Sequence, residues 1–584
     1  MVFYPPSWVP KLPEVPDTVS IPDFLFDEHN GRRPLNQSWD PFTCGLSGRT
    51  RSAQDQKTQV DHLARALNKE FGWKVNEGTE YDKVISVFAF NTIDIMTLNW
   101  AVHRNNGISS PVNSVYNADE LAYQLTNSGS KSIFTVLPLL QTALAAARKV
   151  GIPKERIYLC EMPDITTVGM KMPSGFKTLT QLIEQGASLP PIESLTWTVG
   201  QGARQTAFLC YSSGTSGQAK GVMISHRNVI ANILQVKTYD QIERDKNGPD
   251  YLEVALGLLP QSHIYGLIVI CHVSVYRGDQ VIVLPKFDIQ QYLRSISNFK
   301  INVLYIVPPI IISMVKNKHL LTNFDLSSVK SIFTAAAPLG KEIAQELTDQ
   351  YPGWKVRQAY GLTETCTAVT SSSPHDIWFG SSGSLLPGCE AKLMTVEGNE
   401  ITGYDQPGEL WMKSPSVVLG YLKNAVATKE TFVEETEGRF MRTGDEAVFR
   451  KAPSGNEHIW IVDRMKELIK VKKGMQVAPA ELEACLLDHP AVADCAVIAV
   501  PDDWAGEVPK AYVVRSNHVG LLESEAMTRR EICKYVEGKK SKHKWLEGGV
   551  EFIDIIPKSP SGKILRRLLR DRDRMDRRKQ RSKL

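Results

Sequence analysis

The sequence predicts an α/β protein with two unequal domains. The N-terminal domain is expected to be large and multi-layered, with β-sheets, covering helices and a small β-barrel-like subdomain, and the C-terminal domain to be small and α+β. Three observations predict this: strand-like and helix-like segments alternate through most of the 584 residues, Gly388–Leu422 is rich in β and turn residues, and a compact unit of roughly 120 residues begins after Arg464.

Strand–helix alternation is clearest in the middle of the chain. Ala207–Tyr211 is expected to be a buried strand, followed by a Ser/Gly-rich loop and a helix from about His226 with Ser225 as its N-cap. Three more strands are expected, each leading into a loop or helix: Val303–Val307, Lys330–Thr334 and Lys355–Gln358. Loops after the carboxyl ends of parallel strands commonly carry function, so we expect the site there.

Two strongly apolar runs, Leu267–Tyr276 and Leu304–Ile312, are shorter than the ~18 residues that a membrane-spanning helix requires. We therefore expect no transmembrane segment and interpret both runs as buried core strands. The N-terminus, MVFYPPSWVP, has neither the basic nor the apolar region of a secretory signal.

The C-terminal unit follows a different pattern, in which helices and strands are mixed. Its expected elements, in order, are helix Pro479–Leu487, strands Asp494–Val500 and Lys510–Val514, helix Ser524–Lys539, strand Val550–Ile555 and a final basic helix.

Composition excludes several classes of protein. Hydrophobic residues make up 42% and charged residues 23%, close to globular averages, which excludes disordered, collagen-like and coiled-coil chains. The nine cysteines are dispersed with no CxxC pair, which favours reduced thiols in a reducing compartment and no zinc site.

The positive charge is concentrated at the C-terminal end. Lys563–Leu584 contains eleven Lys or Arg and three Asp, whereas the whole chain carries +4. Acids alternate with bases (RDRDRMDRR) and no aromatic residues are interleaved, so a solvated helix end is favoured over a nucleic-acid or membrane-surface patch. The last three residues, Ser582, Lys583 and Leu584, match the tripeptide that the peroxisomal import receptor reads, and they predict the peroxisomal matrix.

A Ser/Gly-rich loop, YSSGTSGQAKG, follows the strand that ends near Tyr211. Its glycines let backbone N–H groups approach phosphate oxygens, its hydroxyls add donors, and Lys220 adds a positive charge. It is not a Walker A loop, because Gly221 stands where that motif has Ser or Thr. A flexible turn is the alternative for such a loop taken alone.

The loop resembles the phosphate loop of adenylate-forming (ANL superfamily) acyl-CoA ligases, and further motifs of that family follow in order. They are YGLTET at Tyr360–Thr365, TGD at Thr443–Asp445, DRMKELIK at Asp463–Lys470 and PKSPSGK at Pro557–Lys563. The 4-coumarate–CoA ligase-like branch is the most similar group, given LPQSHIYGL at Leu259–Leu267 and KELIK…GMQVAPAELE.

The resemblance implies an ATP-dependent carboxylate–CoA ligase, with Mg²⁺ as cofactor and coenzyme A as co-substrate. It would form an acyl-adenylate with release of pyrophosphate, and then an acyl-CoA thioester. The resemblance also implies an AMP-binding domain at residues 1–463, a hinge at 464–466 and a mobile lid domain at 467–584. The acid would be aryl or phenylpropanoid-like, or a medium-to-long-chain fatty acid, used in a specialised pathway.

Residue roles carried over from the family fall into four groups. The catalytic residues would be Lys563, Lys220, Thr363 and Glu364, with Glu364 also binding the metal. The ATP or AMP contacts would be Ser212, Ser213, Gly214, Thr215, Ser216, Lys220, Gln358, Thr363, Asp445, Arg464 and Lys563. The acid or acyl-adenylate contacts would be His263, Ile264, Tyr265, Ala336, Ala359, Gly361, Ala368, Lys466, Lys470 and Gln476. The CoA contacts would be Lys286, Lys473 and Gly474.

Some alternatives stay open. The segment KELIKVKKGMQVAP is one residue longer than its family counterpart, so either Lys472 or Lys473 takes the CoA role. His263 is either a pocket gate or a core histidine bonded to backbone. For the whole chain, the alternatives are a luciferase-like or stand-alone adenylation enzyme that passes the acyl group to another acceptor, and a binding protein that works through its basic end.

Overall fold

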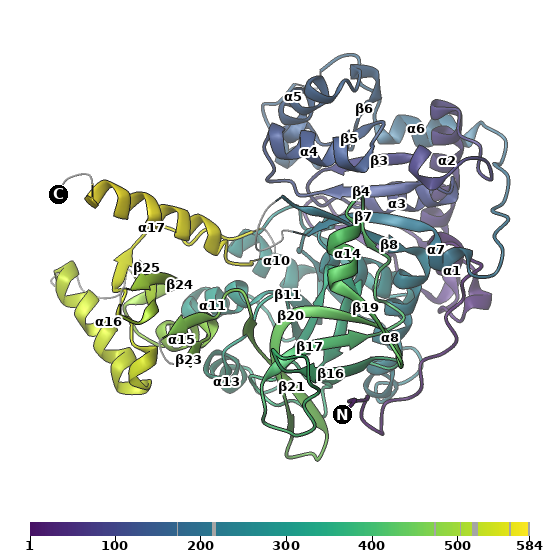
Figure 1. Ribbon diagram of the computed structural model, residues 1–584. Helices are drawn as coiled ribbons and strands as arrows, with labels where there is room; N and C mark the ends of the chain where they lie inside the picture. Colours follow the sequence, from purple (N-terminus) through teal and green to yellow (C-terminus); the bar gives the residue numbers. More distant parts are fainter. Residues whose placement is uncertain are drawn as a thin grey trace.

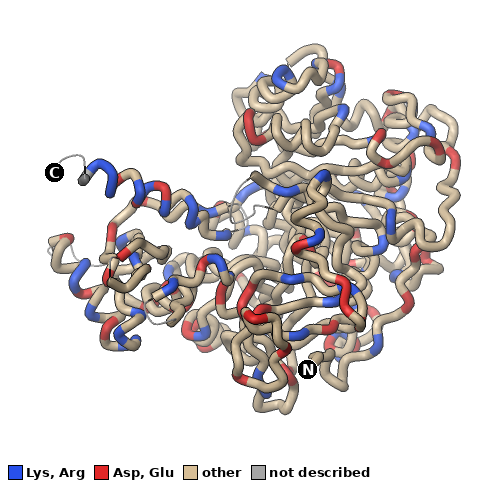
Figure 2. Tube along the Cα trace, in the orientation of Figure 1, with Lys and Arg blue, Asp and Glu red and all other residues tan. Residues whose placement is uncertain are grey.

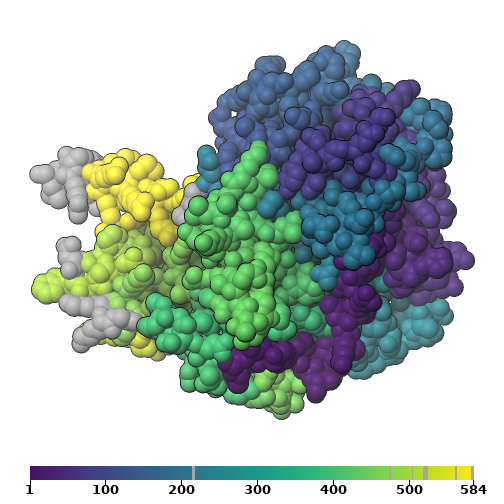
Figure 3. Space-filling model, turned by 45° about the vertical axis from the view of Figure 1, so that its right-hand side comes forward, coloured from purple at the N-terminus to yellow at the C-terminus, as the bar shows by residue number. Residues whose placement is uncertain are grey.

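The computed structural model describes residues 1–171, 173–212, 218–471, 475–502, 504–516, 524–559 and 562–581. Most of them build one large body, from which the C-terminal residues project as a smaller lobe (Figures 1 and 3). The predicted α/β class with a large and a small domain is confirmed.

Two large mixed sheets form the centre of the N-terminal body. The nine-stranded sheet has the order β15-β14-β13-β12-β11-β9-β10-β1-β2, and the seven-stranded sheet has the order β18-β8-β7-β4-β3-β5-β6. The strands of the first are β1 Phe42–Cys44, β2 Thr50–Arg51, β9 Val254–Gly257, β10 Gln280–Val283, β11 Val303–Ile306, β12 Ser331–Thr334, β13 Lys355–Leu362, β14 Thr367–Ser371 and β15 Ser384–Leu385. Those of the second are β3 Val84–Phe88, β4 Ile108–Val112, β5 Ile133–Thr135, β6 Ile157–Leu159, β7 Thr206–Ser212, β8 Lys220–Ser225 and β18 Gly420–Tyr421.

The β-rich segment that begins near Gly388 forms a third, five-stranded antiparallel sheet, in which β21 pairs with β20 beside the path β16-β17-β20-β19. The strands are β16 Glu390–Met394, β17 Gly408–Lys413, β19 Phe432–Glu435, β20 Gly438–Lys451 and β21 Glu457–Arg464. This sheet matters for the site because the TGD motif lies on β20 and the DRMK motif begins at the end of β21.

Helices cover the sheets, and several begin where the sequence predicts. Helix α8 starts at His226 because a capping box precedes it. The Ser225 side chain accepts a hydrogen bond from the backbone N–H of Asn228, and the Asn228 side chain accepts one from the backbone N–H of Ser225. The helices of the N-terminal body are α1 Ile21–Phe26, α2 Ala53–Phe71, α3 Ile95–Arg104, α4 Ala118–Ser128, α5 Leu140–Val150, α6 Leu179–Ala187, α7 Gln201–Arg204, α8 His226–Asp245, α9 Ser274–Arg277, α10 Ile289–Phe299, α11 Pro308–Lys316, α12 Lys318–Leu321, α13 Lys341–Gln350 and α14 Ala425–Thr431. Among the described helices, none is both long enough and apolar enough to cross a bilayer.

The interpretation of Leu267–Tyr276 as a strand is wrong. Tyr265–Val273 is a fully buried π-helix (η7) that continues into α9. The run Leu304–Ile312 is a strand only as far as Ile306 and then turns helical at Pro308. A segment that is buried on every side loses the periodicity that separates helix from strand, which explains the error at Leu267–Tyr276.

The C-terminal lobe has its own sheet, of order β23-β22-β25-β24 with β26 beside β25. Its elements are β22 Ile469–Val471, β23 Met475–Val477, α15 Pro479–Leu487, β24 Val492–Asp502, β25 Gly506–Arg515, α16 Glu525–Lys539, β26 Val550–Phe552 and α17 Arg566–Arg581. Basic and acidic residues alternate along α17 (Figure 2), and its Arg570 and Arg572 pair with Glu467 and Glu551 of the same lobe.

The lobe is docked against α11 of the large body. The ammonium of Lys316, at the end of α11, donates to the carbonyl oxygens of Val492 and Ala493 at 2.5 and 3.1 Å. This contact helps to set the orientation in which the lobe meets the site.

Candidate active site

The phosphate-loop motif joins β7 to β8. Ser212 ends β7 and Lys220 begins β8, and the two residues lie opposite each other in the antiparallel pair. The predicted donors Ser213, Gly214, Thr215 and Ser216 lie outside the described residues. The two described ends of the loop therefore lie side by side at the carboxyl end of β7.

The second motif lies at the end of β13. Thr363 and Glu364 follow this strand in a short 3-10 turn, and the Glu364 carboxylate meets the phosphate-loop strand. Its Oε1 accepts hydrogen bonds from the hydroxyls of Ser212 and Tyr421, each at 3.0 Å. Residues separated by 152 positions in sequence are thus in direct contact.

Gly361 is required by the backbone at this point. A β-bulge lies between Tyr360 and Gly361, and a Cβ on Gly361 would stand 1.7 Å from the carbonyl oxygen of Thr367. Thr367 itself has a φ of 101°, which is costly for a β-branched residue. Backbone strain of this kind often marks functional sites.

The TGD motif brings Asp445 opposite Arg464 in the β20–β21 pair. The Nε of Arg464 lies 3.4 Å from Oδ1 of Asp445, while the hydroxyl of Tyr360 donates to Oδ2 at 2.6 Å. Burial raises the pKa of Asp445, and the charge of Arg464 is the largest influence that opposes this rise. The result is a buried carboxylate that can accept hydrogen bonds, beside a guanidinium that can donate them.

Lys563 enters the same region from the C-terminal lobe. Its backbone N–H donates to Oγ of Ser559 at 3.2 Å, which closes the described part of the lysine loop. Gly562 approaches the N-terminal body so closely that a Cβ there would lie 3.1 Å from Cγ2 of Val307. The described part of the loop therefore rests on the large body at Gly562.

Charges around Lys563 identify its neighbours. Burial and the nearby Arg464 lower the pKa of Lys563 to about 8, against the opposing effect of three carboxylates, those of Asp445, Glu364 and Glu467. Burial is the largest cause of the shift, and the charged groups that also contribute lie within electrostatic reach of Lys563. One region between the two domains is thus surrounded by residues from five separate motifs: Lys220, Glu364, Asp445, Arg464 and Lys563.

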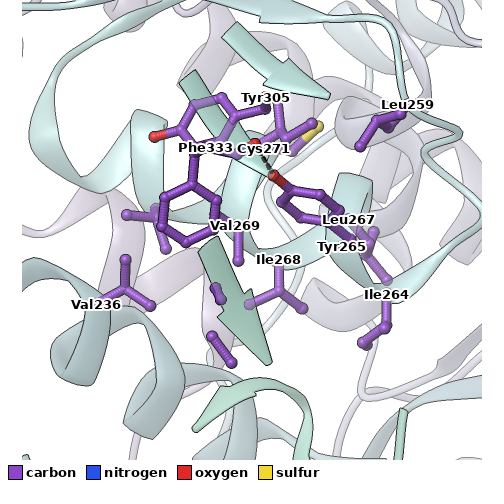
Figure 4. Close-up of a cluster of buried hydrophobic side chains, with 14 of the residues drawn as sticks. Val236, Leu259, Ile264, Tyr265, Leu267, Ile268, Val269, Cys271, Tyr305 and Phe333 are labelled. Carbon is purple, nitrogen blue, oxygen red and sulfur yellow. Dashed lines mark hydrogen bonds between the residues drawn. The ribbon is translucent and has the colours of Figure 1, made fainter. Parts of the chain in front are cut away.

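The proposed acyl wall lies beside this region, around the start of η7. Figure 4 shows Tyr265 facing Tyr305 and Phe333, with the Tyr265 hydroxyl donating to the carbonyl oxygen of Phe333 at 2.7 Å. Ala359 is buried and Ala336 is exposed with a φ of 72°. Ile264 and Ala368 are also buried, and the carbonyl of Ile264 accepts from the hydroxyl of Thr367 at 3.0 Å.

His263 shows one of the two features that the sequence left open, a hydrogen bond to the backbone. Its Nδ1 accepts from the backbone N–H of Tyr265 at 3.3 Å, as a core histidine would. Burial, and secondarily the charge of Lys563, lower its pKa to about 4, so His263 is uncharged at neutral pH.

Other predicted residues are exposed or make hydrogen bonds to other parts of the chain. Lys470 and Gln476 are exposed and opposite each other in the β22–β23 pair of the lobe, and Lys466 and Lys286 are exposed. The Gln358 side chain accepts a hydrogen bond from the backbone N–H of Leu339 at 3.1 Å and donates one to the Ser382 hydroxyl at 3.4 Å, both within the large body. Lys472, Lys473, Gly474, Ser582, Lys583 and Leu584 lie outside the described residues.

Two tyrosines were not singled out from the sequence. Tyr360 lies inside YGLTET, and its position within a recognised motif was the available signal. Tyr421 contacts Glu364 from 57 positions away, and no local pattern indicates such a contact.

Comparison with known proteins agrees with this geometry. The model of the AMP-binding enzyme family matches residues 36–422, and that of the AMP-binding enzyme C-terminal domain matches residues 481–563. The chain belongs to the AMP-binding enzymes. Two relatives within the family are named acyl-CoA ligases. The easD protein of Emericella nidulans is 41% identical, covering 98% of this chain and 100% of its own, and the cm3C protein of Cordyceps militaris is 40% identical, covering 98% and 90%.

Solved structures of AMP-binding enzymes share the fold. The anthranilate CoA ligase AuaEII in complex with anthranoyl-AMP has a TM-score of 0.79 at 22% identity and covers 96% of this chain and 98% of its own. ATP-bound MatB from Rhodopseudomonas palustris has a TM-score of 0.75 at 24% identity, with coverages of 94% and 98%. The predicted membership among adenylate-forming acyl-CoA ligases is therefore confirmed.

Proposed function

We propose that this AMP-binding enzyme is an ATP-dependent carboxylate–CoA ligase that acts through an acyl-adenylate. The observation that carries the proposal is the position of Lys563. Lys563, from the C-terminal lobe, is partly buried and lies within electrostatic reach of Asp445 and Glu364 of the N-terminal domain and of Arg464 at the hinge. A positive charge at that point stabilises the negative charge that shifts between a carboxylate and the α-phosphate.

The chemistry proceeds in two displacements. A carboxylate oxygen of the acid attacks the α-phosphorus of ATP, and the bond to the β-phosphate oxygen breaks to release pyrophosphate. The sulfur of coenzyme A then attacks the acyl carbonyl carbon, its proton passes to solvent, and AMP leaves. In the first step the protein chiefly positions the reactants and neutralises negative charge, and Lys220 and Lys563 would supply the positive charge.

Glu364 fits the role of holding Mg²⁺. Mg²⁺ in nucleotide sites is usually bound through one or two carboxylates together with substrate phosphates. Glu364 offers one carboxylate, oriented by two hydroxyl donors on Oε1 and adjacent to the phosphate loop. Bound there, Mg²⁺ would supply charge neutralisation at the phosphates.

The second displacement requires a different arrangement of the lobe. Lys470 and Gln476 are predicted to serve the acyl-adenylate, yet in this arrangement both are exposed on the lobe. We infer that residues 467–584 turn about a hinge at 464–466, so that Lys563 withdraws and this strand pair faces the site. Lys286, with Lys473 and Gly474, would then bind coenzyme A.

The acid is inferred to be a monocarboxylate, either aryl or phenylpropanoid-like or a medium-to-long-chain fatty acid of a specialised pathway. The wall residues Tyr265, Ala336, Ala359 and Gly361 are uncharged, and His263 is neutral because of its low pKa of about 4. We also propose the peroxisomal matrix as the location, on the basis of Ser582–Leu584.

The test of the activity is a panel of carboxylic acids assayed for pyrophosphate release with ATP and for acyl-CoA by mass spectrometry. Lys563→Ala should abolish pyrophosphate release while sparing thioester formation from a supplied acyl-adenylate. Lys558→Ala, in the same loop but paired with Asp494 at 2.6 Å, is the matched control and should retain both activities. Absence of pyrophosphate release with every acid would contradict the proposal.

The location has its own test. A fluorescent fusion that ends in Ser582–Leu584 should give punctate staining that overlaps a peroxisomal marker, and removal of the three residues should leave it in the cytosol. Unchanged staining after the truncation would contradict the assignment.

A further inference from the structure

Tyr421 touches both charged groups of the phosphate site. It lies in the short strand β18, which pairs with β8 so that Tyr421 is opposite Val222, two residues beyond Lys220. Its hydroxyl donates to Oε1 of Glu364 at 3.0 Å, and the ammonium of Lys220 lies over its ring, 4.7 Å from the centroid.

The ring itself is held firmly. Tyr421 is 7% exposed, its ring lies 5.9 Å from that of Phe432, and its backbone N–H donates to Oγ1 of Thr428 at 3.0 Å. The next residue continues the pairing, because the N–H of Leu422 donates to the carbonyl of Gly221 at 2.8 Å. Tyr421 is therefore held in one position, in which its ring contacts Lys220 and its hydroxyl contacts Glu364.

Lys220 and Glu364, both described, form no ion pair with each other. Opposite charges that line one site neutralise each other unless something separates them, and neither would then be available to phosphates or to Mg²⁺. Tyr421 offers each group a different partner: the face of the ring attracts the ammonium, and the hydroxyl donates to the carboxylate.

We propose that Tyr421 is a positioning residue that holds Lys220 and Glu364 apart and preorganises them for a Mg²⁺-bound nucleoside triphosphate. The inference rests on the proposed function and deepens it, since it concerns how the same site meets its nucleotide. The inference has two parts that can be tested separately: the Tyr421 hydroxyl acts through Glu364, and the Tyr421 ring acts through Lys220.

The test measures nucleotide binding by calorimetry, without any acid, for ATP with Mg²⁺ and for ATP with EDTA. Tyr421→Phe keeps the ring and should weaken binding of the Mg²⁺ complex about tenfold, while binding of metal-free ATP stays unchanged. Tyr421→Leu removes the ring as well and should also weaken binding of metal-free ATP. Tyr81→Phe is the matched control, because it removes a buried hydroxyl that contacts Thr206 at 3.1 Å and the sulfur of Met223 at 3.2 Å.

Double-mutant cycles separate a positioning role from a general structural one. Tyr421→Phe should have no further effect in a Glu364→Gln background, and Tyr421→Leu should have a reduced effect in a Lys220→Met background. A crystal structure of Tyr421→Leu without nucleotide should show an ion pair between Lys220 and Glu364.

Two results would overturn the inference while leaving the proposed function intact: additive effects of Tyr421→Phe and Glu364→Gln, or equal weakening with and without Mg²⁺. If the wild-type protein bound no MgATP at all, both the inference and the proposed function would fail.

Discussion

Replacement of Lys563 by methionine should make the protein more stable although it disables the chemistry. The environment of Lys563 lowers its pKa from 10.5 to about 8, chiefly through burial. At about 1.4 kcal/mol per pKa unit, keeping this lysine charged in the folded protein costs about 3 kcal/mol. The unfolded chain holds the proton more tightly, so the cost applies in full below about pH 8 and disappears above about pH 10.5.

Urea unfolding of the wild type and of Lys563→Met, measured from about pH 7 to about pH 10, tests this linkage. The variant should be more stable by up to about 3 kcal/mol at about pH 7, and the difference should shrink steadily at higher pH. Pyrophosphate release should fall at least about 100-fold over the same range, because a charge that stabilises the transition state is lost.

The control is Lys558→Met, which removes a lysine of the same loop that is paired with Asp494 and should gain no stability. If Lys563→Met were no more stable than the wild type at about pH 7, or if its advantage did not depend on pH, the assignment of a buried, charged Lys563 would be refuted.

Three further substitutions test other parts of the structure. Gly361→Ala would force a Cβ to 1.7 Å from the Thr367 carbonyl oxygen, so the free energy of unfolding should fall by about 3 kcal/mol or more. Gly353→Ala, at a position with open space, is the control and should be neutral. Equal melting temperatures for the two variants would contradict the bulge at Gly361. Asp445→Asn removes the charge that Arg464 faces and should weaken MgATP binding about 10-fold to 100-fold in calorimetry. An unchanged affinity would show that the Asp445–Arg464 pair does not take part in nucleotide binding. Lys316→Ala removes both hydrogen bonds from α11 to the lobe and should loosen the lobe, so tryptic cleavage at the exposed Lys466 should become several-fold faster. An unchanged cleavage rate would show that Lys316 does not hold the lobe in place.

Local sequence predicted the elements that carry local signals. The strand at Ala207–Tyr211 became Thr206–Ser212, and the helix expected from His226 begins there because Ser225 caps it. The helix expected at Pro479–Leu487 has those bounds, as a proline at the first helical position favours. The error at Leu267–Tyr276 arose where the segment is buried on all sides, so that no face of it differs in polarity from another.

The sequence by itself determined which chemical groups the protein presents: a hydroxyl- and glycine-rich loop ending in Lys220, a carboxylate in YGLTET, and a lysine in PKSPSGK. Only the tertiary structure decided that Glu364 meets Ser212 and Tyr421, and that the partly buried Lys563 comes within electrostatic reach of Asp445. The physical reason is that these contacts join strands of different sheets and of both domains. Their partners are chosen by strand pairing and domain docking, which no short stretch of residues encodes.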